Sequence, residues 1–360
     1  MGSNATKTSH FFKHKPLFGL DIGASSLKVM QVDDEIHKNG RQSIVGYGTS
    51  HFDKAAIDNG ELVQPELVAK AMLELFKSGL IGDITTRRVA MAIPAYRTFT
   101  RAITLPALKQ KELADAVQLE AEQYIPVPID ELYLDYTVIR SDKESTEVFA
   151  VAVPRKIVDS YLNLAKITGL EAVLIETTLG GCSRLFGQDK QSAGASVIID
   201  FGSTSSDISI FDKNILVTGT VQGGGAVFTS SIKAKLGVTQ AEANIIKNKY
   251  GLSLSKKQKE IREALTPTLD QIVKEIRRMI RYYDERYGAD KPVNQVITLG
   301  GGANMPGLAE YMTEALRLPV RHCEPWQYLD HKKLQIPSNA DKPMYATAAG
   351  LALVNPKEVL

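Results

Sequence analysis

One short pattern occurs twice in this chain and constrains its fold more than any other feature. Residues 17–32 read LFGLDIGASSLKVMQV, an apolar run that ends at Asp21, passes small residues and resumes around Lys28. Residues 196–211 read SVIIDFGSTSSDISIF and repeat this order around Asp200. Each copy predicts two strands joined by a tight turn. Because the second copy begins past the middle of the 360-residue chain, the pattern predicts two similar lobes that contribute one hairpin each to a shared cleft.

The residue types in these turns suit phosphate binding. Glycine lets backbone N–H groups point into one concavity and hold an anion, and hydroxyl side chains add donors. Carboxylates repel phosphate, so Asp21 and Asp200 predict Mg²⁺, held largely through water, between them and a nucleotide. Lys28 would supply positive charge for the phosphates. The alternative is two ordinary turns in which Asp is a turn former. The other expected ligand residues are Gly23, Ala24, Ser25 and Ser26 in the first turn, and Gly202, Ser203, Thr204 and Ser205 in the second.

Two glycine triplets extend the predicted site. One follows an apolar strand over 293–299 and precedes a helix that we expect to begin near Asn304 and Pro306. The other, Gly223 to Gly225, opens a predicted helix with apolar Val227, Ile232 and Leu236. A triplet leaves no side chains where a flat base or a ribose phosphate would pack, although plain strand-to-helix turns also contain glycine. The expected contacts are Gly223, Gly224, Gly225, Gly300, Gly301, Gly302 and Asn304.

Composition narrows the class of protein. With 43 basic and 41 acidic residues, the net charge of +2 gives no field that favours nucleic acid or an anionic membrane. Cys182 and Cys323 have no metal-ligand spacing, which suits a reducing compartment. The first 16 residues lack a signal-peptide core, and no stretch approaches the ~18 apolar residues of a membrane span. We therefore expect a cytoplasmic protein.

The order of these motifs resembles that of the actin/Hsp70/sugar-kinase ATPase superfamily over residues 17–354. The resemblance implies an α/β fold with two lobes around a cleft for ATP or ADP and Mg²⁺. By the same resemblance, Asp207 belongs to the second phosphate motif and Gly300–Gly302 to the adenosine motif. Glu176 stands before a first connecting helix, where it would hold the attacking water or the hydration shell of the metal. Residues 345–353 resemble the second connecting helix, with Ala349 and Gly350 allowing close packing against the first.

A helix over 238–251 is expected at the ribose and base. Glu242 and Lys247 match a run that recurs in this superfamily, so the resemblance implies ribose binding by Glu242. The alternative is a solvated helix face. A further helix over 268–288 has an apolar face and a basic face. Because acidic residues interrupt the basic face, we expect a core helix with one solvated side rather than a surface for lipid or nucleic acid.

The stretch 88–168 distinguishes branches of the superfamily. It predicts strands over 88–93 and 97–105, a helix over 110–125 and two further strands, and it closes with a helix over 156–169. Leu113, Val117 and Ala121 would lie on one face of the first of these helices. This inserted subdomain resembles that of the FtsA and PilM branch. Three phrases, FFKHKPLFGLDIG, TLPALKQKELADAVQLEAEQYIPVPIDELYLDY and GGGANMPGL, are similar to the PilM family of type IV pilus assembly proteins.

The resemblance implies that the chain is divided into five segments, which together build two lobes and one inserted subdomain. We expect a first-lobe core over 17–95, an inserted FtsA-like subdomain over 96–168, a return to the first lobe with the connecting helix over 169–195, a second lobe over 196–342 and a C-terminal connecting helix over 343–354.

The PilM resemblance implies an ATP-binding cytoplasmic scaffold of the pilus assembly platform, peripheral to the inner membrane through its partners. The N-terminal cytoplasmic tail of PilN would dock between the first-lobe core and the insert, with nucleotide state coupled to partner binding. We expect the walls of this groove among Val89–Ile93, Phe99–Leu105 and the 110–124 helix, unless these residues are simply core. Pilus motor ATPases, a PilC-type platform protein and self-association are further implied partners, and nucleic acid is not.

Two other functions use the same fold. A small-molecule kinase needs a carboxylate base and polar residues around a sugar, and the insert offers mostly apolar strands. An FtsA-like division filament protein reaches the membrane through an amphipathic helix, which the tail LVNPKEVL does not predict. We expect nucleotide binding, with at most slow ATP hydrolysis.

Overall fold

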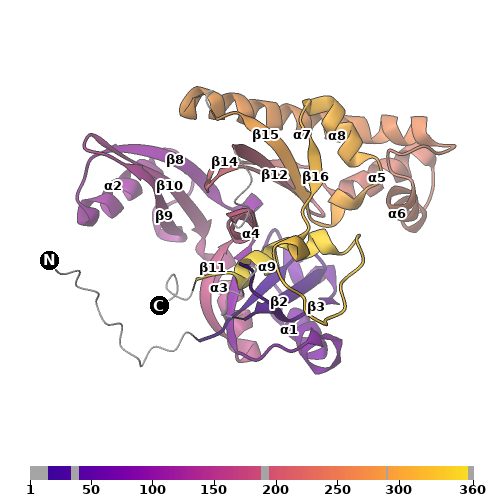
Figure 1. The fold of residues 1–360 in the computed structure, drawn as a ribbon, viewed down its shortest axis with the longest axis horizontal. Coiled ribbons are helices and arrows are strands. Elements are labelled where there is room, and N and C mark those ends of the chain that lie inside the picture. Colours follow the sequence, from indigo (N-terminus) through magenta and orange to yellow (C-terminus); the bar gives the residue numbers. More distant parts are fainter. Residues whose placement is uncertain (1–14, 34–39, 188–193, 289–290, 356–360) are drawn as a thin grey trace.

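A computed structural model describes residues 15–33, 40–187, 194–288 and 291–355. The prediction about a signal peptide concerns residues 1–16, of which only 15 and 16 lie inside these ranges. Residues 356–360, at the end of the tail, also lie outside them. In the part of the chain that is described, none of the helices has the length and hydropathy that a membrane span requires. Figure 1 shows two lobes with an additional subdomain beside them.

The first lobe is built on a six-stranded sheet with the strand order β11-β7-β1-β2-β3-β6. Its first strand pairs antiparallel with β2 and parallel with β7. Both β1 and β7 are buried on their two faces, which explains their nearly continuous apolar sequences. The strands are β1 (Phe18–Ile22), β2 (Ser26–Val32), β3 (Ile44–His51), β6 (Ile81–Gly82), β7 (Arg88–Ile93) and β11 (Glu171–Thr177).

The second lobe repeats this arrangement. Its sheet has the order β14-β13-β12-β15-β16, in which β12 pairs antiparallel with β13 and parallel with β15. The prediction of two similar lobes with one hairpin each is therefore confirmed. The strands are β12 (Ala195–Phe201), β13 (Ser205–Asp212), β14 (Asn214–Gln222), β15 (Val293–Leu299) and β16 (Val320–His322).

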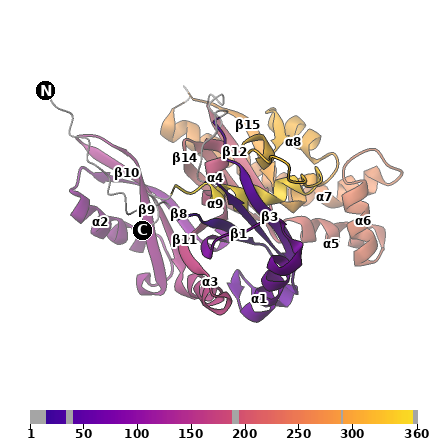
Figure 2. The ribbon, with the colours of Figure 1, turned by 60° about the horizontal axis from the view of Figure 1, so that its bottom comes forward.

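Helices cover the outer faces of both sheets and separate their inner faces. Among the described helices, two pack on the outer face of the first sheet, and four contribute to the core on the outer face of the second. Two short helices lie between the sheets (Figures 1 and 2). The outer helices are α1 (Pro65–Glu74), α3 (Arg155–Thr168), α5 (Gly225–Leu236), α7 (Gln258–Tyr287) and α8 (Leu308–Leu316), with α6 (Gln240–Lys249) beside α5; the inner ones are α4 (Thr178–Gly187) and α9 (Ala346–Ala352).

The insert, defined here as β8, α2, β9 and β10, forms its own three-stranded sheet in the order β8-β10-β9. Leu113, Val117 and Ala121 are buried on one face of its helix, as their spacing predicts. Figure 2 shows the insert standing at the side of the molecule opposite α5 and α6. The elements are β8 (Phe99–Pro106), α2 (Gln110–Glu122), β9 (Leu132–Ser141) and β10 (Ser145–Pro154).

The helix that closes the predicted insert packs elsewhere. Ile157, Tyr161 and Leu164 of α3 are buried in the core of the first lobe, against the outer face of its sheet. The sequence predicts an amphipathic helix here, but periodicity does not say which of two neighbouring sheets its apolar face will cover.

Two other helices begin away from the expected positions. α7 begins at Gln258, ten residues before the predicted start, and contains Pro267 inside the helix. A proline normally marks a helix boundary, and here burial of Ile261 and Leu265 ahead of it sustains the additional turns. After the last glycine triplet, a 3₁₀ turn over Gly301–Asn304 precedes α8, which therefore begins at Leu308 rather than near Asn304.

The two inner helices approach each other to backbone contact. A Cβ added to Gly350 of α9 would lie 2.0 Å from the carbonyl oxygen of Gly181 on α4. A Cβ on Gly19 of β1 would lie 2.1 Å from the carbonyl oxygen of Ala348. Glycine is therefore required at this crossing, which brings α4, α9 and β1 together between the sheets.

We predict that Gly350→Ala lowers the free energy of unfolding by about 2 kcal/mol or more, because the methyl group forces the two helices apart. Urea unfolding followed by circular dichroism measures the effect. Gly187→Ala on α4 is the matched control, since its Cβ meets nothing within 4 Å. Equal midpoints for the two variants would contradict the close crossing.

Candidate functional site

The two predicted turns occupy matching positions but differ in their backbone hydrogen bonds. In the first, Gly23 N donates to the Ser26 carbonyl at 2.9 Å, and Ala24 and Ser25 are exposed at the tip. In the second, Gly202 N donates to the Asp200 carbonyl at 3.1 Å, and Ser203 and Thr204 are exposed. These exposed tips leave hydroxyl and backbone groups free to meet a ligand. Ser205 is buried at the start of β13.

The two hairpins place different partners opposite their aspartates. Asp21 lies across the β1–β2 ladder from Lys28, and the two side chains form an ion pair at 3.8 Å. At the matching position of the second hairpin, Asp200 lies across from Asp207. Asp207 accepts a hydrogen bond from the Thr220 hydroxyl at 2.6 Å. Both Asp21 and Lys28 are buried, so their ion pair is shielded from water.

Burial raises the pKa of all three carboxyl groups, and repulsion by neighbouring carboxylates adds to the shift of Asp200. For Asp200, burial, then Asp207 and Asp21, raise the pKa to about 7 while Lys28 opposes the shift. Burial raises the pKa of Asp207 to about 6 against the Thr220 hydroxyl and the Tyr96 backbone N–H. Burial also raises the pKa of Asp21, with Lys28 opposing. Three carboxylates around one ammonium group leave negative charge that a divalent cation would neutralise.

The glycine triplets both converge on the second turn. A Cβ on Gly300, where φ is +81°, would lie 2.2 Å from Oδ1 of Asp200. A Cβ on Gly224 would lie 2.4 Å from the carbonyl oxygen of Gly202, which also accepts a hydrogen bond from Gly225 N at 2.9 Å. Backbone thus packs directly against the aspartate and its turn. The remaining members of these triplets are Gly223, buried beside Thr268, Gly301, exposed, and Gly302, packed on Phe201.

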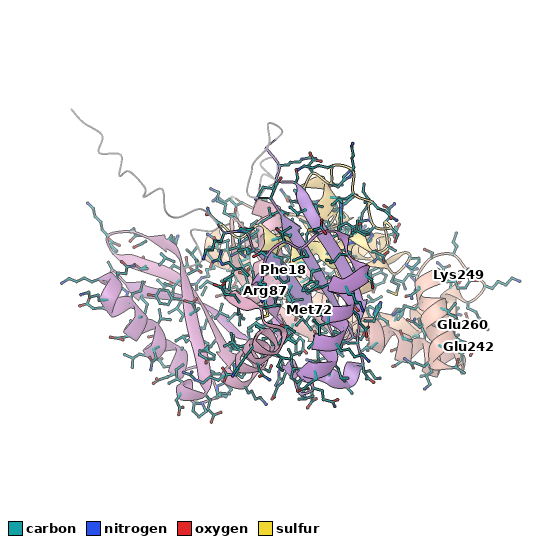
Figure 3. All side chains as sticks on the ribbon, turned by 90° about the horizontal axis from the view of Figure 1, so that it is seen from below. Phe18, Met72, Arg87, Glu242, Lys249 and Glu260 are labelled. Carbon is teal, nitrogen blue, oxygen red and sulfur yellow. The ribbon has the colours of Figure 1, made fainter. Side chains whose placement is uncertain are left out.

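We call the two glycine triplets packed on the second turn the glycine cradle. Lys247 contacts this cradle, and Glu242 lies outside it. Lys247 Nζ donates to the Gly225 carbonyl at 3.0 Å. Glu242 instead closes a capping box at the start of α6, where its carboxylate accepts from the Thr239 backbone N–H at 2.8 Å. Figure 3 shows Glu242 at the outer end of the second lobe, far from Phe18. Asn304 donates to the Ala340 carbonyl and so fastens a loop.

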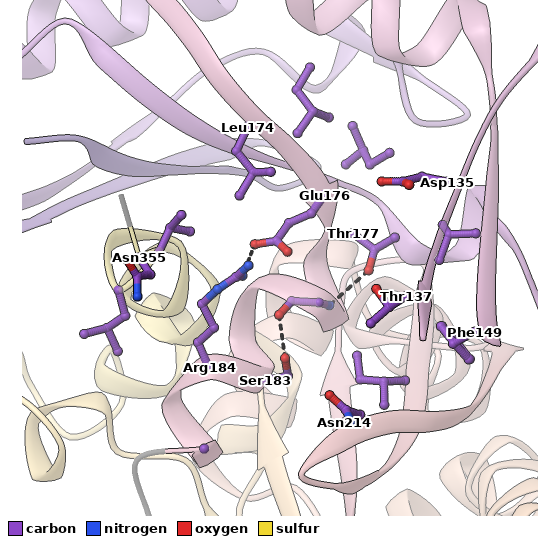
Figure 4. Close-up of a pocket in the computed structure, with 18 of the residues that line it drawn as sticks. Asp135, Thr137, Phe149, Leu174, Glu176, Thr177, Ser183, Arg184, Asn214 and Asn355 are labelled. Atoms are coloured by element: carbon purple, nitrogen blue, oxygen red, sulfur yellow. Dashed lines mark hydrogen bonds and ion pairs between the residues drawn. The ribbon is translucent and has the colours of Figure 1, made fainter. Parts of the chain in front are cut away.

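Glu176 lies at the end of β11 rather than in either turn. Its register partner on β7 is Ala92, which in turn pairs with Asp21, so Glu176 is two strands, roughly 10 Å, from the first aspartate. Its carboxylate forms an ion pair with Arg184 of α4 (Figure 4). This pairing orients the Glu176 carboxylate along α4.

The donor set fits a magnesium ion that keeps most of its waters. Among the described residues, no group of three or more His, Cys, Asp or Glu side chains has the geometry to hold a metal. Mg²⁺ is commonly bound by one or two carboxylates together with water and substrate phosphates. Asp21 and Asp200 supply carboxylates of this kind beside two turns with exposed tips, and the backbone of Gly300 packs directly against Asp200.

A cavity of about 1370 Å³ lies between the insert and the first lobe. One wall is the face of β9 and β10 that carries Thr137, Phe149 and Val151. The opposite wall is formed by β11 and α4, including Leu174 and the Glu176–Arg184 pair (Figure 4). The β13–β14 turn closes one end, and residues after α9 contribute the other.

The walls of this cavity differ from the expected groove walls. Of the expected stretches, Ile93 lines the cavity. Phe99 lines a separate cavity of about 650 Å³, Val89 lies in the first-lobe core, and Val117 and Ile103 lie in the core of the insert. Val89, Ile103 and Val117 are therefore core residues, as the alternative expects, and the position of the peptide groove stays a prediction. Strand alternation defines two faces of the insert sheet, but it does not say which one α2 covers.

Sequence reasoning missed a contact between the insert and the second lobe. Glu147 of β10 is 2% exposed and binds Arg286 of α7. The available signal was the glutamate that begins the apolar run EVFAVAV, because a buried charge requires a partner. Its partner lies 139 residues away, beyond the reach of pattern analysis.

We predict that Asp200→Asn changes the pH dependence of stability in metal-free protein. A folded-state pKa near 7, above the ordinary value of 3.8, means that the folded state retains a proton that the unfolded state has released. The stability from this group is therefore lost as pH rises from about 4 to 7. Melting temperatures in EDTA should favour the variant increasingly over this range, and a constant difference would refute the shift.

Comparison with known proteins agrees with this geometry. The family model described as type IV pilus assembly protein PilM matches residues 19–355. A solved PilM-PilN type IV pilus biogenesis complex is 23% identical, with a TM-score of 0.81 over 95% of this chain and 98% of that chain. EutJ from Carboxydothermus hydrogenoformans is 15% identical, with a TM-score of 0.55 over 93% and 88% of the two chains. MreB5 of Spiroplasma citri bound to AMPPNP is 15% identical, with 0.52 over 94% and 95%. The fold is that of the actin-like ATPases, and the chain belongs to the PilM family of type IV pilus assembly proteins.

Proposed function

We propose that this protein is a nucleotide-binding scaffold of the pilus assembly platform that holds the N-terminal cytoplasmic tail of PilN in the cavity between the insert and the first lobe. The observation that supports this proposal most directly is the cavity itself, which combines apolar residues with the Glu176–Arg184 ion pair and is bordered by two outer strands. The similarity to a solved PilM-PilN complex supports the choice of partner.

An extended peptide suits this cavity. β11 is the outer strand of the first sheet and β9 the outer strand of the insert sheet. Consecutive residues of both strands, 174–177 and 133–137, line the cavity, so main-chain groups as well as side chains border it. Extended peptides bind such sites through main-chain hydrogen bonds to a strand edge and through alternate side chains in apolar pockets. Phe149, Val151 and Leu174 would receive these side chains.

The cleft between the two turns is the proposed site of ATP or ADP. Gly23 to Ser26 and Gly202 to Ser205 would hold the phosphates, with Lys28 adjacent to the first turn and Lys247 to the glycine cradle. Mg²⁺, when bound through water to Asp21 and Asp200, would offset the charge of the phosphates. The fold similarity to an MreB5 bound to AMPPNP supports a nucleotide here.

We propose that the nucleotide acts as a conformational ligand. A ligand shifts an equilibrium between open and closed lobes by its difference in affinity for them. Glu176, the candidate for positioning water, is engaged by Arg184, so at most slow hydrolysis is expected. The protein would act in the cytoplasm, at the inner face of the inner membrane through PilN. Binding of motor ATPases, of a PilC-type protein or of a second copy stays a prediction of the sequence.

Asp200→Ala is expected to abolish binding of ATP in the presence of Mg²⁺, because the metal loses one of its two carboxylates. Isothermal titration measures the affinity. Asp212→Ala is the matched control, since Asp212 lies at the far end of β13 and pairs with Lys291 on the surface. In EDTA the difference between Asp200→Ala and the unmodified protein should disappear. Normal Mg-ATP affinity of Asp200→Ala would exclude the assignment of the second turn.

Leu174→Glu is expected to weaken binding of a PilN-tail peptide by about tenfold or more, because it places a charge in the apolar wall. Fluorescence anisotropy with a labelled peptide measures this affinity, and the melting temperature reports whether the variant is folded. Leu119→Glu is the control, because Leu119 is exposed on α2, away from the cavity. Equal affinities for the two folded variants would place the peptide elsewhere.

A further inference from the structure

A buried ion pair joins the insert to the second lobe. Arg286, in the last turn of α7, lies 2.8 Å from Oε1 of Glu147 on β10 and donates to the Thr104 hydroxyl on β8 at 3.0 Å. The Tyr287 hydroxyl donates to Glu147 at 3.2 Å. Arg140 of β9 lies 3.2 Å from the other carboxylate oxygen. We call Thr104, Glu147, Arg286 and Tyr287 the bridge.

The bridge is a strong contact because its carboxylate is removed from water. Glu147 is 2% exposed, so its charge depends on Arg286, Arg140 and Tyr287 for stabilisation. Burial, with the charge of Glu147, raises the pKa of Tyr287 to about 12, so this hydroxyl stays a donor. As long as the insert and α7 stay packed together, removal of Arg286 would leave this buried charge without its main partner, which is strongly unfavourable.

Further contacts along β8 and β9 follow the same interface. The hydroxyl groups of Thr100 on β8 and Thr218 on β14 are hydrogen-bonded. Ile139 of β9 packs against the core of the second lobe. The insert therefore contacts the second lobe along one side of its sheet, whereas at its other end Val153 lies in the first-lobe core and the Tyr133 hydroxyl donates to Asp159 of α3.

The bridge and the cavity wall lie on the same face of the same strand. Glu147, Phe149 and Val151 alternate along β10, so their side chains share one face at intervals of about 7 Å. Glu147 meets α7 of the second lobe, whereas Phe149 and Val151 line the cavity. The facing wall, which includes Leu174, belongs to the first lobe.

We infer that the bridge makes the insert move with the second lobe, so that closure of the lobes changes the distance between the two walls of the cavity. This inference rests on the proposed function for the identity of the ligands, but the mechanical link itself is a property of the chain. Because coupling between two binding sites is reciprocal, a peptide in the cavity would change the affinity for nucleotide by the same factor.

Distances between spin labels test the mechanical link without a partner. Cysteines replace Leu119 on α2, Ile245 on α6 and Leu73 on α1, all more than 60% exposed. The natural Cys182 and Cys323 are buried and stay in place. When AMPPNP and Mg²⁺ are added, the 119–245 distance should stay constant and the 119–73 distance should change. A change in 119–245 at constant 119–73, or no change in either, would overturn the inference.

Glu147→Gln removes the charge at constant shape and should broaden the 119–245 distance distribution. Glu263→Gln is the matched control, because Glu263 pairs with Lys235 on the surface of the second lobe. If Glu147→Gln does not fold, Thr104→Val removes one acceptor of Arg286 and serves in its place. A 119–245 distribution that stays as narrow as in the Glu263→Gln control would refute the role of the bridge.

The affinity for a PilN-tail peptide tests whether the bridge couples the nucleotide site to the cavity. AMPPNP should change the Kd by about threefold or more in the unmodified protein, and by a clearly smaller factor in Glu147→Gln. An equal factor in both would refute the coupling role of the bridge. If the peptide does not bind at all, the proposed partner fails, while the label distances still decide whether the insert follows the second lobe.

Discussion

The contact between Gly350 and the Gly181 carbonyl is the constraint on which the rest of the structure depends. It lets α4 and α9 cross at backbone distance between two sheets that would otherwise be held apart by side chains. The cores on the outer faces of the sheets are separate, and the core between the sheets contains α4, α9 and the stack of Tyr47 on Trp326 and Tyr345. This shared core fixes the position of one aspartate turn relative to the other.

The two hairpins have equivalent strand pairing, but the side chains at matching positions carry different charges. Lys28 faces Asp21 in the first lobe, whereas an aspartate occupies the matching position opposite Asp200. One half of the cleft is thus internally neutralised and the other carries excess negative charge. In the absence of a cation, protonation of Asp200 relieves this repulsion, which together with burial raises the pKa of its carboxyl group.

Structural features that depend on short-range sequence patterns could be predicted from the sequence. Both hairpins, the glycine triplets and the buried face of α2 follow from alternation, turn chemistry and helical periodicity. Contacts between distant segments could not be predicted, because nothing local to Glu147 specifies Arg286, and nothing local to α3 specifies its sheet. Glu242 illustrates the remaining ambiguity, since a glutamate three residues after Thr239 fits both a ligand and a capping box.

The two outer strands beside the cavity also bear on how the protein behaves alone. Strand edges with unpaired N–H and C=O groups are templates for pairing with any extended chain, and most proteins protect them. Here β9 and β11 border the same opening, so access is restricted to a segment narrow enough to enter between them. If the cavity binds a peptide as proposed, its walls would admit one extended segment to these edges and exclude the sheets of other molecules.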